Sequence, residues 1–228
     1  MRTAELRILC EGETEYNFVN RVLKEHLRLR GVFVKDSINL RTNLRGVKPF
    51  EHLRDKIRGD LGRLRGHQYI TTMLDLYALP NYPGDPGRRV SGRERAQRIQ
   101  AAMHAELPSP QFIPYIQVHE FEALVFVDLH QLGPQFPDGE ATGALEQLER
   151  ERHNLAPEEI NDGPQTAPSK RLIRAVPAYD DVKALAGPEI AARIGLPRLR
   201  AACPHFDAWV SSLERLGPGG AVDRAPAG

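Results

Sequence analysis

The chain has 228 residues, of which 41% are hydrophobic and 27% charged, as expected for a globular protein of one large domain or a domain with an appendage. No apolar run is long enough to span a bilayer, and Glu5 and Arg7 interrupt any signal-peptide pattern, so we expect neither a membrane protein nor a secreted one. The two cysteines, Cys10 and Cys203, lie far apart in the sequence and carry no nucleophile signature, which favours a reducing, cytoplasmic location over a disulfide.

The net charge of +1 is unevenly distributed along the chain. Residues 1–110 contain 20 Lys and Arg against 13 Asp and Glu, and the remaining residues contain 11 against 17. A basic half that holds a local group of acids suits a polyanionic substrate bound around a metal ion. Ordinary variation between helix faces would give the same totals and stays an alternative.

The first 75 residues alternate between strand and helix patterns. Residues 6–10 and 69–74 are apolar runs that predict buried strands, and residues 32–40 carry a second candidate strand. Apolar residues recur at helical spacing over residues 15–30 and 50–64. Strands that alternate with helices predict a mostly parallel sheet.

Acidic residues follow the ends of these strands. Glu11, Glu13 and Glu15 surround a break at Gly12, and three carboxylates so close together repel one another unless a cation lies among them. A hard divalent ion such as Mg²⁺ is the natural candidate. A solvated, acid-rich first helical turn, favoured by the helix dipole, is the alternative.

A later strand ends in the same way, at Asp75. Parallel strands share their carboxyl edge, where open α/β folds place their sites, so Glu11 and Asp75 are expected to converge there. A third apolar segment, residues 112–118, runs directly into Glu120 and Glu122. The repetition favours a metal site over a solvated helical turn.

The second half of the chain has weaker patterns. Residues 77–90 read as a loop rich in Pro, Gly and aromatic residues, and Ser91 with Glu94 predicts the start of a helix. A short helix is expected over residues 144–152, and two or three small helices over residues 188–216.

These patterns predict an α/β fold whose mostly parallel central sheet is flanked by helices and covered by a helical C-terminal cap. We expect a single domain over residues 1–216, with a core at about 1–130 and the cap at about 131–216. Residues 217–228, rich in Pro, Gly and Ala, are expected to form a disordered tail.

The acid–Gly–acid segment after the first strand, together with Asp75, resembles the Toprim domain, the Rossmannoid metal-binding module of topoisomerases, primases and OLD-family nucleases. More closely, the chain resembles domain-of-unknown-function family 4276, which is related to the OLD and RloB-type Toprim nucleases. The closer resemblance covers most of residues 6–216. Four stretches carry it: Thr72–Pro80, His119–Leu124, Pro168–Arg171 and Cys203–Trp209.

The resemblance implies roles for the acids of the first two strand ends. Glu11 would serve as general acid or base near the scissile phosphate. Asp75 would be the first member of an Asp-x-Asp pair that holds Mg²⁺ or Mn²⁺, but Tyr77 occupies the second position, and a phenol is a poor ligand for Mg²⁺.

Other residues would then complete the metal site. The available replacement ligands are Glu15, Glu120 and Glu122, of which Glu122 matches the family pattern best. Lys170 would supply the positive charge that steadies the phosphate in the transition state. Substrate contacts are expected from Tyr77, His119, Arg88, Arg41 and Arg45, although packing or solvated charge is an alternative for each of them.

The function that the resemblance implies is metal-assisted phosphodiester hydrolysis, on DNA rather than RNA, as part of a bacterial phage-defence system. The partner would be an AAA/ABC-type ATPase encoded nearby, because this sequence has no Gly-x-x-x-x-Gly-Lys-Ser/Thr loop of its own. Two alternatives stay open: a catalytically degenerate Toprim scaffold that binds nucleic acid or the ATPase, and phosphoryl or nucleotidyl transfer to a small nucleotide. A homodimer is also left open.

Overall fold

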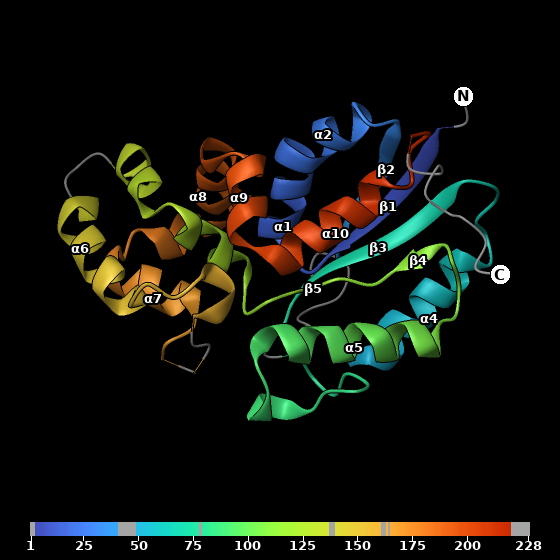
Figure 1. Cartoon of the computed structure of the whole chain (residues 1–228), viewed down its shortest axis with the longest axis horizontal. Helices are drawn as coiled ribbons and strands as arrows, with labels where there is room; N and C mark the ends of the chain where they lie inside the picture. The colour runs from blue at the N-terminus through green and yellow to red at the C-terminus, as the bar shows by residue number, and fades with distance from the viewer. Residues whose placement is uncertain are drawn as a thin grey trace.

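The structure, a computed structural model, describes residues 3–40, 49–77, 79–136, 140–160, 163 and 165–219. A parallel sheet with helices on both faces forms its centre, and further helices lie beyond the carboxyl ends of the strands (Figure 1). The expected α/β class and the helical C-terminal region are confirmed. None of the helices in these ranges is long and apolar enough to cross a membrane.

The strands are arranged in the order β2-β1-β3-β4, with β5 also paired to β3, and every pairing within the described residues is parallel. The three expected strands of the N-terminal half are confirmed. The strands are β1 (Ala4–Cys10), β2 (Val32–Asn39), β3 (Gln68–Asp75), β4 (Phe112–Ile113) and β5 (Ile116–Gln117).

Strand β1 lies between β2 and β3 and is buried on both sides. Its register with β3 runs without interruption to Cys10 opposite Met73. Its register with β2 shifts after Leu6, which pairs with Val34, because Lys35 is an extra residue on β2 before pairing resumes. Lys35 is therefore the extra residue of a β-bulge on the outermost strand of this side.

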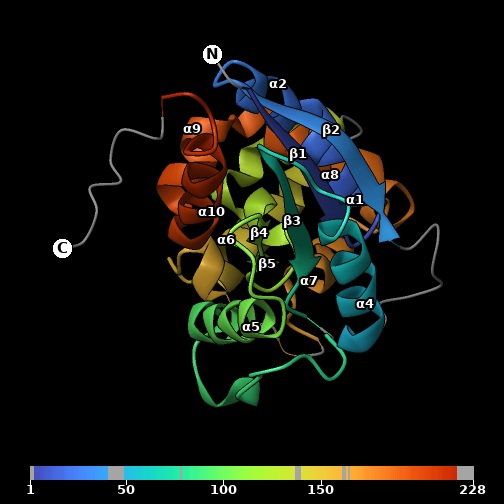
Figure 2. The same cartoon turned by 90° about the vertical axis from the view of Figure 1, so that its right-hand side faces the viewer.

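Two apolar clusters form on the two faces of the sheet. On one face, Leu6 and Ile8 pack with Phe18, Leu27 and residues of the C-terminal helices. The opposite face carries a second cluster, covered by helices α4 (Phe50–Leu61) and α5 (Gly92–Glu106), as Figure 2 shows. Its members include Leu9, Phe50, Leu53, Ile57, Ile70, Leu74, Ala96, Ile99 and Met103.

The segment after β1 is helical from Glu13 to Arg28. It consists of α1 (Glu13–Phe18), a π-helical stretch, η1 (Val19–Leu23), and α2 (Lys24–Arg28). Gly31, at φ +75°, follows the helix and turns the chain into β2. The expected helix and its glycine end are confirmed.

The expected strand over residues 112–118 is split in two. Pro114 has no backbone N–H to donate to a ladder. The side chain of Thr72 fills the gap, since its hydroxyl accepts from the Tyr115 amide and donates to the Tyr115 carbonyl, both at 2.8 Å. The chain beyond β5 still runs beside β3, which matters for the site.

The C-terminal helices differ from expectation mainly at one boundary. The sequence predicts a short helix that begins at Lys170 and further small helices from residue 188, but α8 already begins at Tyr179 and continues through Pro188. Helix α6 is also longer than the expected residues 144–152. The remaining elements are η2 (Gly87–Arg89), η3 (Phe121–Val127), η4 (Leu129–Gln135), α6 (Glu140–Arg152), η5 (Pro157–Glu159), α7 (Pro168–Ala175), α8 (Tyr179–Ile194), α9 (Leu196–Ala202) and α10 (Pro204–Glu214).

The expected disordered tail falls mostly outside the described residues, which end at Gly219. Within them, Gly217 packs so closely against the turn after α2 that a Cβ there would lie 2.0 Å from the carbonyl oxygen of Arg30. Gly217 and Pro218 are therefore packed against the turn after α2, whereas Gly219 is exposed.

Truncating the central strand tests this packing. Leu6→Ala removes a fully buried side chain from β1 and should lower the free energy of unfolding by about 2–5 kcal/mol. Leu29→Ala, the same change at a side chain that is 68% exposed, should change it by less than about 0.5 kcal/mol. Urea denaturation of both variants makes the comparison, and equal losses would contradict the assigned core.

Candidate functional site

The register of β1 and β3 brings Glu11 and Asp75 together. Cys10 pairs with Met73, and the Glu11 amide continues the ladder by donating to the Met73 carbonyl at 2.9 Å. The Glu11 side chain then accepts a hydrogen bond from the Asp75 amide through Oε2, also at 2.9 Å. Two acids that are 64 positions apart in the sequence thus meet at the carboxyl edge of the sheet, as expected.

Glu15 lies on the first turn of α1, above this edge. Its Oε2 accepts from the Gly12 amide at 2.7 Å, so the carboxylate caps the beginning of the helix. Glu13, by contrast, is exposed. Burial, and then the negative charge of Glu11, raise the pKa of Glu15 to about 8, against an ordinary value of 4.5. Capping explains the position of Glu15, but it does not remove the repulsion between the two buried acids.

A third segment carries Glu120 and Glu122 to the same place. The chain after β5 still pairs with the end of β3, since the Tyr77 amide donates to the His119 carbonyl at 2.8 Å. Glu120 Oε2 accepts from the Ser169 amide at the start of α7, at 2.9 Å. Both glutamates are buried, as the end of an apolar strand dictates.

Glu122 is held between Glu120 and helix α8. Burial, and then the charge of Glu120, raise the pKa of Glu122 to about 7. Two groups of α8 act in the opposite direction: the Lys183 ammonium by its charge, and the Tyr179 hydroxyl, whose Oη lies 3.4 Å from Glu122 Oε1. Glu122 therefore has both a cation and a phenol nearby.

Asp75 lies close enough to all four glutamates for their charges to act on it. Burial raises its pKa well above the ordinary value, and the charges of all four glutamates raise it further. Its Oδ1 is buried and has no hydrogen-bond partner among the described residues. We call Glu11, Glu15, Asp75, Glu120 and Glu122 the acidic cluster.

The acidic cluster has the donor chemistry of a hard-cation site. Carboxylate oxygens are the ligands that Mg²⁺ and Ca²⁺ prefer, and Asp75 Oδ1 is an unused one. As the side chains stand, however, no three His, Cys, Asp or Glu residues of the described ranges form a group ready to hold a metal ion. The residues present fit such an ion by chemical type, and side-chain rotation would have to complete the coordination.

The other expected site residues are arranged around the cluster in different ways. Lys170 is exposed on α7, next to the Ser169 amide that binds Glu120. Tyr77 is half-buried and contributes its amide to the strand pairing. Arg88 is exposed in η2. The expected substrate contacts Arg41 and Arg45 lie outside the described residues.

His119 is buried rather than open to a substrate. Its Nε2 lies 3.1 Å from the Glu158 carbonyl oxygen, and its backbone has a positive φ of +62°. Its ring also lies close to Gly92, where a Cβ would approach Cε1 to 2.9 Å. These contacts join the end of β5 to α5 and η5, so they hold the segment that carries Glu120 and Glu122.

Sequence reasoning missed Tyr179 and Lys183. Both lie on the part of α8 that we did not expect to be helical. Their spacing of four residues, which puts two side chains on one face of a helix, was the available signal. Pro188 concealed it, because a proline usually ends or kinks a helix.

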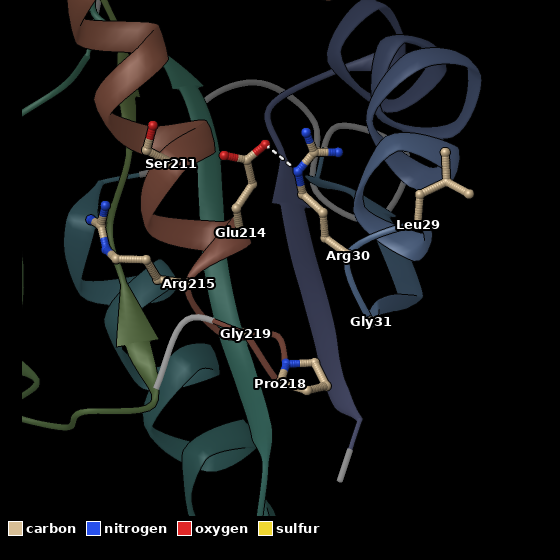
Figure 3. A pocket seen from close by; sticks show the side chains of 8 residues that line it. All are labelled: Leu29, Arg30, Gly31, Ser211, Glu214, Arg215, Pro218 and Gly219. Atoms are coloured by element: carbon tan, nitrogen blue, oxygen red, sulfur yellow. Dashed lines mark ion pairs between the residues drawn. The ribbon is translucent and has the colours of Figure 1, made fainter. Parts of the chain in front are cut away.

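Two hollows that described residues line lie at the end of the sheet opposite the acidic cluster. The larger, of about 700 Å³, is crossed by an ion pair in which Arg30 Nε lies 2.8 Å from Glu214 Oε1 (Figure 3). A smaller one, of about 280 Å³, lies along the first residues of β1 and β3. Neither of these two hollows is lined by a member of the acidic cluster.

The fold and site therefore define an α/β protein with buried acids at the carboxyl edge of a parallel sheet. Residues 10–214 match the family described as Domain of unknown function (DUF4276), and the chain belongs to that family. No curated protein matches the chain. No solved structure matches it either.

The raised pKa values predict how stability depends on pH. Between pH 4.5 and about 8 the native protein retains a proton on Glu15 that the unfolded chain has released, so the free energy of unfolding should fall as pH rises. The slope is at most about 1.4 kcal/mol per pH unit for each such group. Glu15→Gln removes the titration and should flatten the curve, as measured by urea denaturation between pH 5 and 9 in EDTA.

Glu13→Gln is the matched control, because it removes an exposed acid from the same helical turn. It should leave the pH dependence unchanged. A wild-type protein whose stability rises from pH 5 to 8, or a Glu15→Gln variant with the same slope as Glu13→Gln, would contradict the description of the cluster.

Proposed function

We propose that this chain is a Toprim-like nuclease, related to the OLD and RloB-type enzymes, that uses Mg²⁺ or Mn²⁺ to hydrolyse phosphodiester bonds. The observation that supports this most strongly is the meeting of five carboxylates from three separate segments, with four glutamates around Asp75. Mutual repulsion on this scale is costly in a folded protein unless protons or a cation relieve it.

A divalent cation is the relief that fits a catalytic site. Asp75, Glu15 and Glu122 would hold it, with Glu120 as a further ligand. Asp75 Oδ1 is buried, and no hydrogen bond from the described part of the chain competes for it. When bound, such an ion stabilises the charge on the attacking and leaving oxygens of a phosphodiester. Because Glu15 and Glu122 have raised pKa values, binding would displace protons, and affinity should increase with pH.

Glu11 is the residue that we assign as general base. The Asp75 amide holds its carboxylate at the edge of the sheet, among the proposed metal ligands. A carboxylate within hydrogen-bond reach of a water molecule can accept its proton as the water attacks phosphorus. Lys170, exposed on α7, would contact the phosphate and offset the charge that develops there.

The distribution of charge supports nucleic acid as the substrate. Residues 1–110 carry an excess of seven positive charges even with the cluster members Glu11, Glu15 and Asp75 counted, and Arg88 is exposed on η2. A net positive charge attracts a polyanion, whereas the acidic cluster repels it unless a cation lies between them. We propose DNA rather than RNA, and a cytoplasmic role in phage defence beside an AAA/ABC-type ATPase supplied by another chain.

A second candidate function is a scaffold without catalysis, which binds nucleic acid or the ATPase. Two observations favour it. Tyr77 stands where the resemblance calls for a second Asp, and no three acids of the described residues are arranged as a ready metal-ligand group. Under this alternative the acidic cluster would retain shared protons and would bind no divalent ion.

Metal-dependent cleavage separates the two functions. With Mn²⁺ or Mg²⁺, the wild-type protein should cleave plasmid or single-stranded DNA, and EDTA should abolish the cleavage. Glu11→Gln should reduce the rate by about 10²–10⁴-fold, the usual contribution of a general base. Asp75→Asn should weaken Mn²⁺ binding, measured by isothermal titration calorimetry, as well as cleavage.

Glu13→Gln serves again as the control, because it changes an exposed acid next to the cluster and should leave both activities intact. Cleavage that survives in both Glu11→Gln and Asp75→Asn would remove the catalytic assignment. DNA or ATPase binding without any Mn²⁺ binding would support the scaffold.

A further inference from the structure

Tyr179 is a buried phenol at the beginning of α8. Its side chain is fully buried, and its ring packs against that of Phe136, with centroids 6.4 Å apart. The hydroxyl points to Glu122, with Oη 3.4 Å from Oε1. A buried tyrosine hydroxyl needs a hydrogen-bond partner, and here the partner is a carboxylate of the acidic cluster.

Gly187 leaves the space in which this hydroxyl lies. A Cβ at position 187 would be 2.9 Å from Tyr179 Oη and 3.1 Å from Cε1 of Phe121, closer than a methyl group can approach without displacing them. Glycine inside a helix costs roughly 1 kcal/mol relative to alanine, so its presence in α8 calls for a packing reason. The close approach of Tyr179 and Phe121 supplies one.

The contact joins two parts of the chain that the sheet does not join. Glu122 lies on η3, after the last strand, whereas Tyr179 lies on α8. The oxygen–oxygen distance of 3.4 Å exceeds the 2.5–3.0 Å of a strong O–H···O bond, so the phenol restricts the direction of the carboxylate without closing tightly on it.

We propose that Tyr179 is a positioning residue. Its hydroxyl, which lies in the space that Gly187 leaves, donates to one oxygen of Glu122 and thereby turns the other oxygen toward the divalent cation. This rests on the proposed metal-dependent function. Hydrogen-bond partners of metal ligands fix the orientation of those ligands, and their removal typically costs 10–100-fold in metal affinity.

The test is Mn²⁺ binding to the full chain, measured by calorimetry and by Mn²⁺ electron paramagnetic resonance. Tyr179→Phe removes one oxygen and should weaken Mn²⁺ binding about tenfold or more and change the resonance spectrum of bound Mn²⁺. Gly187→Ala should weaken binding in the same direction, by pushing the phenol away from Glu122. Tyr69→Phe is the matched control, because Tyr69 is the second residue of β3, at the end of that strand opposite Asp75, and this variant should bind Mn²⁺ as the wild type does.

A double variant separates positioning from general packing. If Tyr179 acts through Glu122, then adding Tyr179→Phe to Glu122→Gln should produce little further loss of affinity. A Tyr179→Phe variant that binds Mn²⁺ as tightly as wild type, or losses that simply add in the double variant, would overturn this inference and leave the metal site standing. A wild-type protein that binds no Mn²⁺ would instead overturn the proposed function.

Discussion

The hydrogen bond from the Asp75 amide to the Glu11 carboxylate determines where the rest of the site must lie. It exists because β1 and β3 are parallel neighbours in a register that ends both strands at the same level. A shift of one residue in that register would reverse the faces of every following side chain and separate the two acids. The apolar clusters on the two faces of β1 make such a shift costly, so the core of the protein fixes the geometry of its acids.

This arrangement creates an electrostatic problem that the described residues solve only in part. Backbone amides of Gly12, Asp75 and Ser169 each donate to one carboxylate, and such hydrogen bonds stabilise buried negative charge without adding a positive charge. The bond from Gly12 does not lower the pKa of Glu15 to its ordinary level, and none of the three amides donates to the Asp75 carboxyl, whose pKa is also raised. The carboxylates that destabilise the folded chain at high pH are therefore the groups that a bound cation would stabilise most. Functional sites commonly reduce the stability of a protein in this way.

The sequence was sufficient for the parts of the fold that local patterns specify. Acids that directly follow apolar strands were enough to predict that Glu11 and Asp75 meet, because parallel strands leave no other edge for them. Pro114 is a local signal for the division of the expected strand over residues 112–118, because a proline cannot donate to a ladder. The bonds that replace the missing ladder come from Thr72, 43 positions before Tyr115, and no local pattern predicts them. The start of α8 was missed because Pro188 reads as a boundary, while packing against η3 and α1 keeps the helix continuous through it. Tyr179 and Lys183 were therefore not recognised as site residues from the sequence.

The bulge at Lys35 has a consequence for how this protein meets other chains. Strand β2 is the outermost strand on its side of the sheet. The unpaired amides and carbonyls of an edge strand can form hydrogen bonds with a strand of another chain. The extra residue breaks the even spacing of amides along that edge, and the lysine, which forms an ion pair with Glu5, places a charge beside it. The bulge and the charge therefore disfavour edge-to-edge pairing of two molecules through β2, which would otherwise join their sheets into one fibre-like ribbon.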